Sequence, residues 1–112
     1  MKFYKDNNTI LEAINGDSTL NEVVVRSVDA SVEKHVPQIK VEGNIVTVTV
    51  GSVTHPMEDK HYIEFIAIET TKGVQRKNLK PGMEPKAVFA LCDEELVGAY
   101  AYCNLHGMWD NK

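Results

Sequence analysis

Apolar and polar positions alternate through much of the chain, and this pattern predicts β-strands. The clearest example is 45–50, where isoleucine and valines alternate with threonines, as in a strand that is buried on one face. The turn signal at 42–44 precedes this strand and predicts a hairpin with 38–41. The other predicted strands cover residues 22–28, 62–69, 74–77, 86–91 and 97–102.

Short strands at regular spacing, with turn residues between them, predict an all-β fold, an immunoglobulin-like antiparallel β-sandwich. The strand at 74–77 is polar and suits a sheet edge, and 97–102 is expected to be the last strand. No longer segment has a helical pattern, and residues 8–15 fit either one helical turn or a short strand. The more polar N-terminal residues, 1–27, are predicted to form a short appendage to a domain of residues 28–112.

Composition narrows the classes of partner. The length of 112 residues fits one domain, and the net charge of −4 argues against nucleic acid, because a phosphate backbone requires surplus lysine and arginine. The apolar stretches are too short to span a membrane, and the N-terminus has no secretory pattern, so we expect a cytoplasmic protein. Two cysteines in a reducing compartment leave at least one thiol free to bind a metal.

The four histidines all lie in or beside loops at strand ends, where functional residues are concentrated. They are His35, His55, His61 and His106, and Cys103 lies three residues before the last of them. Taken singly, a loop histidine is usually a solvated side chain, a cysteine is usually a small buried apolar residue, and a Cys-x-x-His spacing is weak. Their common placement supports a metal site about as well as it supports these ordinary explanations, so the residue pattern alone leaves both open.

Five such ligands limit the choice of metal. Zinc prefers four ligands, and magnesium and calcium prefer oxygen donors. Imidazole with thiolate suits iron, copper or zinc, and a five-ligand set with one vacant position favours a redox metal that binds a small molecule. Iron is the expected choice.

Four stretches carry a resemblance to a known family: 33–37, 51–65, 79–82 and 102–109. They resemble the iron-binding domain of desulfoferrodoxin and neelaredoxin, the superoxide reductases, with compatible spacing from about 32 to 109. The resemblance implies one mononuclear non-haem iron per chain and one-electron reduction of superoxide to hydrogen peroxide. It implies equatorial ligation by the four histidines, His35, His55, His61 and His106, and axial ligation by Cys103.

The same resemblance gives roles to two residues beside the first histidine. Glu33 is implied to be the sixth ligand of the oxidised iron, and Lys34 to hold the oxygen species and order water for proton delivery. Rubredoxin is the implied electron donor, and a homodimer is the expected assembly.

The chain departs from the two-iron members of the family in its N-terminal segment. That segment resembles the start of the family's desulforedoxin-like module but has no cysteine, so a second iron site should be absent. The segment is expected to be a structural or dimer-forming remnant. Cys92 is expected to be a half-buried apolar residue, and Met108 and Trp109 to cover the site or a subunit contact.

Two other functions are alternatives to superoxide reduction. Dismutation would require ready reoxidation of the iron by a second superoxide, which a thiolate-ligated reductase should do poorly. A zinc-stabilised immunoglobulin-like binding module without catalysis is the alternative from a different class.

Overall fold

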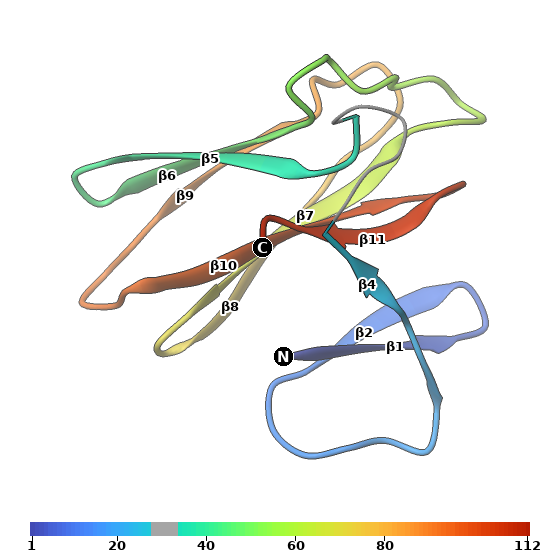
Figure 1. Ribbon diagram of the computed structural model, residues 1–112, viewed down its shortest axis with the longest axis horizontal. Coiled ribbons are helices and arrows are strands. Elements are labelled where there is room, and N and C mark those ends of the chain that lie inside the picture. The colour runs from blue at the N-terminus through green and yellow to red at the C-terminus, as the bar shows by residue number, and fades with distance from the viewer. Residues whose placement is uncertain (28–33) are drawn as a thin grey trace.

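The computed structural model describes residues 1–27 and 34–112, and within these ranges it contains strands in three sheets and no helix (Figure 1). The N-terminal sheet has the order β2-β1-β3, with β1 Lys2–Asp6, β2 Thr9–Ala13 and β3 Asn21–Glu22. The central sheet has the order β4-β11-β10-β7-β8, with β4 Val25–Arg26, β11 Gly107–Asp110, β10 Leu96–Cys103, β7 Ile63–Thr70 and β8 Gly73–Asn78. The third has the order β5-β6-β9, with β5 Pro37–Glu42, β6 Ile45–Val50 and β9 Lys86–Ala90.

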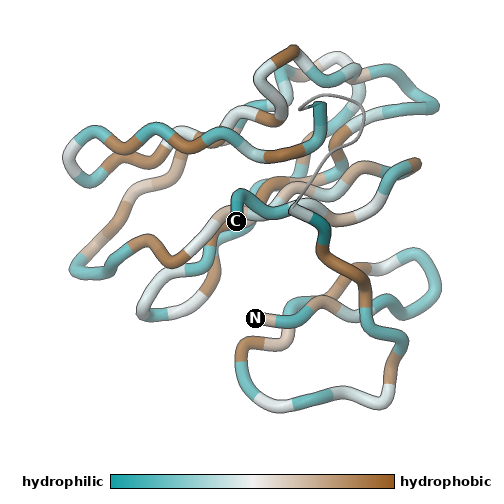
Figure 2. Tube along the Cα trace, in the orientation of Figure 1, coloured by the Kyte–Doolittle hydropathy of each residue, from teal (hydrophilic) through white to brown (hydrophobic). Residues whose placement is uncertain are grey.

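The central sheet and the β5-β6-β9 sheet pack face to face as a β-sandwich, which confirms the predicted fold class. The alternation that predicted β6 points Val46, Val48 and Val50 into the core, where all three are fully buried. Figure 2 shows hydrophobic and hydrophilic residues alternating along the β5–β6 hairpin, as expected for strands with one buried face. The described residues include no helix long and apolar enough to cross a membrane.

Several predicted elements are confirmed. The hairpin of 38–41 with 45–50 is β5–β6, and β8 lies at the edge of the central sheet as its polar sequence indicates. Residues 9–13, within the stretch that fitted either a turn or a strand, form β2.

Two of the strand predictions were wrong. The valine-rich stretch 22–28 is not one strand, because β3 ends at Glu22 in the N-terminal sheet and β4 begins at Val25 in the central sheet. The strand predicted at 97–102 is not the last, because a tight turn leads into β11. β11 also pairs in parallel with β4, so the sandwich is not wholly antiparallel.

The N-terminal sheet packs on the outer face of the central sheet (Figure 1). The ring of Phe3 lies edge-on to Tyr100 with centroids 5.0 Å apart, and Ile10 joins the same cluster. The strands β7 and β10 are therefore apolar on both faces, with successive residues directed to opposite clusters. The division into 1–27 and 28–112 stays a prediction.

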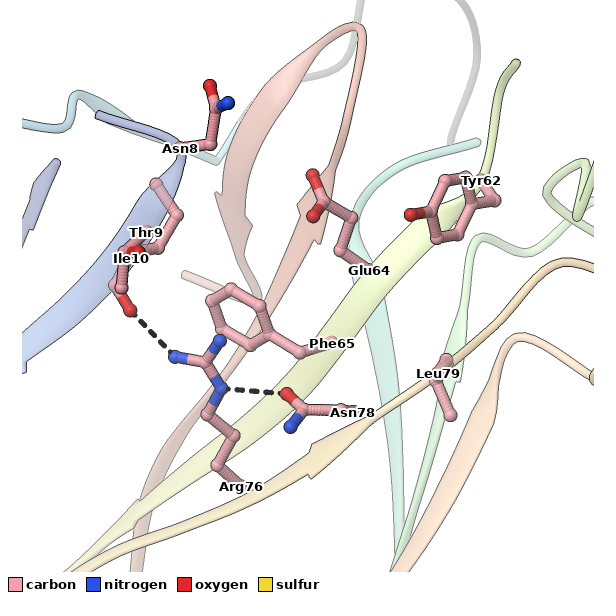
Figure 3. A pocket seen from close by; sticks show the side chains of 9 residues that line it. All are labelled: Asn8, Thr9, Ile10, Tyr62, Glu64, Phe65, Arg76, Asn78 and Leu79. Carbon is pink, nitrogen blue, oxygen red and sulfur yellow. Dashed lines mark hydrogen bonds between the residues drawn. The ribbon is translucent and has the colours of Figure 1, made fainter. Parts of the chain in front are cut away.

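Arg76 on β8 links the N-terminal sheet to the central sheet at a cleft of about 330 Å³ (Figure 3). Its guanidinium lies 3.7 Å from the ring centroid of Phe65 and donates to the carbonyl oxygen of Ile10 at 2.9 Å. It also forms an ion pair with Glu12 at 3.0 Å, in which both side chains are largely covered. Partial burial strengthens such contacts, so this arginine should contribute to holding the two sheets together.

Replacing Arg76 with methionine should lower the free energy of unfolding by about 1–2 kcal/mol, because the cation–π contact and a charge-assisted hydrogen bond are lost together. Urea unfolding followed by fluorescence would measure the change. The matched control is Lys2→Met, which removes the exposed Lys2–Asp17 ion pair and should leave the midpoint unchanged. Equal effects of the two substitutions would contradict a special role for Arg76.

Candidate metal centre

Four loops or strand ends meet at one end of the sandwich and bring the predicted ligands together (Figure 1). His35 precedes β5, His55 and His61 lie in the link between β6 and β7, and Cys103 ends β10. His106 lies in the turn between β10 and β11.

The four imidazoles form a closed four-sided arrangement. Neighbouring ring centroids are 4.9 Å apart for His35–His55, 4.7 Å for His55–His61, 5.0 Å for His61–His106 and 4.7 Å for His106–His35. The His35–His61 separation across the ring is 6.5 Å, longer than every side. The four rings therefore surround a common space, as the ligands of a single metal would.

Cys103 enters the group from the core side of the sandwich. It follows Ala99 and Ala101 on the inward face of β10 and is fully buried. A turn of three residues then connects it to Gly107, whose φ of 83° is readily adopted by glycine. This tight turn brings His106 back over the cysteine, with the Sγ and the His106 Nδ1 3.7 Å apart.

The donor atoms are directed so that each can bind a metal. His35 Nε2 lies 3.0 Å from His106 Nδ1, an approach that two ring nitrogens with lone pairs would avoid unless a proton or a cation lay between them. His55 turns its Nδ1 to the carbonyl of Pro56 at 2.7 Å, which leaves its Nε2 as the second nitrogen. The Nε2 atoms of His55 and His61 are buried and have no hydrogen-bond partner among the described residues.

Burial disfavours the charged forms of three candidate ligands, His55, His61 and Cys103. The pKa of His55 is lowered to about 4, mainly by desolvation and also by the neighbouring imidazoles, although the hydrogen bond to the Pro56 carbonyl acts in the opposite direction. The pKa of His61 is lowered for the same reason. Burial raises the pKa of the Cys103 thiol, although the backbone N–H groups of Leu105 and His106 oppose this by bonding to the sulfur. Neutral imidazole is the form that binds metals.

The donors of His35, His61, Cys103 and His106 all lie within 4.8 Å of one another and could hold a metal ion. His55 lies outside that group, but its ring contacts those of His35 and His61. Imidazole nitrogens with a thiolate are suitable ligands for iron. The orphaned Nε2 atoms supply an independent reason to place a cation there, since buried polar atoms are normally satisfied.

Asn104 joins the two ligand-bearing loops, a role that the sequence did not indicate. Its Oδ1 accepts from the backbone N–H of Tyr62 at 2.9 Å, and its Nδ2 donates to the carbonyl of Lys60 at 3.0 Å. Its own backbone N–H bonds to the Tyr62 carbonyl at 3.2 Å. These bonds flank His61 on both sides and fix it relative to Cys103.

Trp109 also contacts two of the ligands, His35 and His106. In the sequence, the only sign of these contacts is that Trp109 lies three residues after His106. Its ring is stacked on that of His35, with centroids 4.9 Å apart and an interplanar angle of 16°. The prediction that it covers the site is consistent with this contact.

The remaining predicted residues differ in their settings. Lys34 is exposed, and its charge is close enough to lower the pKa of His61. Glu33 lies outside the described residues. Cys92 is exposed rather than half-buried as predicted, because the turn after β9 faces solvent.

Fold and site together define a small β-sandwich protein with a histidine- and cysteine-lined metal-binding group. The sequence model of the desulfoferrodoxin family matches residues 27–112, and the chain belongs to that family. A desulfoferrodoxin homolog of Archaeoglobus fulgidus is 54% identical over 87 residues, which are 78% of this chain and 69% of that protein.

Solved structures agree with this assignment. The superoxide reductase from Treponema pallidum superposes with a TM-score of 0.84 at 39% identity, covering 100% of this chain and 99% of that one. The one-iron superoxide reductase from Giardia intestinalis has a TM-score of 0.61 at 43% identity and covers 70% of this chain and 95% of its own.

Replacing Asn104 with alanine should weaken binding of Co²⁺ to the metal-free protein by about 10-fold or more, because the His61 loop loses its link to the Cys103 turn. Titration followed by the visible absorption of Co²⁺ would measure the affinity. The control is Asn111→Ala, which also removes an amide that accepts from the backbone of β10, but at Ala99 in the middle of the strand. Unchanged binding in Asn104→Ala would contradict the assigned role.

Proposed function

We propose that this protein is a superoxide reductase, which transfers one electron to superoxide and, with two protons, yields hydrogen peroxide. The single observation that carries the proposal is the closed arrangement of four imidazoles with a buried thiol beside it. Membership of the desulfoferrodoxin family and the likeness to solved superoxide reductases support the same activity.

One mononuclear non-haem iron would be held by five residues: His35, His55, His61, Cys103 and His106. The directed atoms are Nε2 of His35, His55 and His61, Nδ1 of His106 and Sγ of Cys103, as the contacts described above support. When bound, the iron supplies the electron that reduces superoxide, and the thiolate tunes the readiness with which that electron is given.

The burial of the ligands defines the side from which an anion can approach. Cys103, His55 and His35 are buried, whereas His61 is partly exposed and His106 is exposed. Lys34 is exposed and immediately precedes His35, so its ammonium can attract superoxide and hold water for proton delivery. Glu33 is proposed as a ligand of the oxidised iron.

The partners follow from the same proposal. The electron donor is rubredoxin, and the active assembly is a homodimer. Neither nucleic acid nor a membrane is a partner, in line with the net charge of −4 and the absence of a membrane-spanning helix from the described residues. The protein acts in the cytoplasm.

The iron-loaded protein should consume superoxide and the electrons of a reduced donor, form hydrogen peroxide and release no oxygen. An oxygen electrode, with a peroxide assay and metal analysis, distinguishes this outcome from its rivals. Oxygen release would indicate dismutation, and a colourless protein that contains zinc and lacks activity would indicate a binding module.

Cys103→Ser should abolish the visible thiolate-to-iron charge-transfer band of the oxidised protein, because the sulfur donor is gone. Cys92→Ser is the matched control, since Cys92 is exposed and belongs to a different loop, and its spectrum should be unchanged. Retention of the band in Cys103→Ser would exclude this cysteine as the ligand.

Lys34→Met should slow superoxide consumption by about 10-fold and flatten its dependence on ionic strength, because a local positive charge beside the site is removed. Lys34→Arg should keep most of the rate. Lys40→Met is the control, because Lys40 is an exposed lysine of β5 that is paired with Glu42. A rate in Lys34→Met equal to that of the control would exclude electrostatic attraction by Lys34.

A further inference from the structure

Trp109 contacts two of the candidate ligands at once. The indole ring is stacked on the imidazole of His35, at a centroid distance of 4.9 Å and an angle of 16°. The indole Nε1 donates a hydrogen bond to the backbone carbonyl of His106 at 3.1 Å. His35 and His106 are 71 positions apart in the chain, so one side chain joins ligands from distant segments.

We propose that Trp109 is a positioning residue, which sets the imidazole of His35 against that of His106 before a metal arrives. This inference rests on the proposed metal site and goes beyond the ligands themselves.

Stacking restrains the His35 ring. Both side chains are nearly buried, with exposures of 4% for His35 and 5% for Trp109. An imidazole in face-to-face contact with an indole cannot rotate about its Cβ–Cγ bond without pushing its edge into the larger ring. The nitrogen of His35 that lies 3.0 Å from His106 is thereby held in place.

The indole hydrogen bond restrains the other ligand. The carbonyl of His106 belongs to the short turn that follows Cys103, and a bond to it limits rotation of the peptide between His106 and Gly107. That peptide precedes a residue with a φ of 83°, where the chain reverses, so a small rotation there would displace the imidazole.

Trp109 is itself held by its place in the sheet. It pairs with Ala101 on β10 and with Arg26 on β4, so its backbone is bonded on both sides. The side chain of Arg26 also lies 5.9 Å from the indole centroid. A rigid element of the scaffold, rather than a loop, therefore carries the residue that supports the ligands.

The test is Co²⁺ titration of the metal-free full-length protein, followed by visible absorption, which requires no catalytic activity. Trp109→Leu should bind about 10–100-fold more weakly than the original protein, because both restraints are lost. Trp109→Phe should show a smaller loss, because a phenyl ring can still stack on His35 but has no N–H.

Phe3→Leu is the matched control, because Phe3 is a fully buried aromatic residue of the cluster on the outer face of the central sheet, and that cluster includes no candidate ligand. It should be destabilised without loss of affinity. Affinity in Trp109→Leu within about twofold of the original protein, or an equal loss in Phe3→Leu, would overturn the inference.

A second measurement needs no substitution. Trp109 is the only tryptophan, so its indole resonances are unambiguous. In the metal-free protein, nuclear Overhauser contacts should join this indole to the His35 ring, and their absence would also overturn the inference. Failure of the original protein to bind Co²⁺ would instead count against the proposed metal site.

Discussion

The turn between β10 and β11 is the constraint on which the metal centre depends. Only three residues connect Cys103 to Gly107, and the chain reverses within them because glycine adopts a positive φ there. Alternate residues of β10 point into the core, and Cys103 is the last of them. The turn then brings the Nδ1 of His106 to 3.7 Å from the Cys103 Sγ. Asn104, in the same turn, bonds to the loop that carries His61, so the hairpin positions three ligands with few residues.

Close packing of four imidazoles and a thiol has an electrostatic consequence. Burial adds a desolvation cost and the neighbouring imidazoles add repulsion, so the pKa values of His55 and His61 are lowered and their neutral forms are favoured. A bound cation reverses the balance, because it stabilises a thiolate and satisfies the Nε2 atoms of His55 and His61 that have no other described partner. The same neutral, closely spaced donors that are unfavourable without a metal are therefore suited to binding one.

Local patterns predicted the strands whose alternation is strict, such as β6, and the polar edge strand β8. They failed where tertiary contacts decide the structure. Residues 22–28 resemble one strand, but the chain changes sheets between Glu22 and Val25. The short strand β11 has no alternating pattern of its own and exists through pairing with β10 and β4.

The candidate ligands were identified by residue type and by their position at strand ends, together with the family resemblance. Of their supporting residues, Asn104 was not identified, and Trp109 was expected only to cover the site or a subunit contact. Nothing about an asparagine or a tryptophan in isolation indicates a bond to Lys60 or a stack on His35, because those contacts depend on register and on segments that are distant in sequence. The two faces of the central sheet have different roles. The inward face of β10 carries Cys103, whereas outward residues such as Tyr100 are covered by Phe3 of the N-terminal sheet. The packing of the N-terminal sheet on this outer face uses apolar side chains and no thiol. The cysteine-free N-terminal segment can therefore keep a structural role. The last strand of the N-terminal segment, β4, pairs with β11, which carries Trp109. The segment that covers the outer face therefore also supports the strand next to the metal centre.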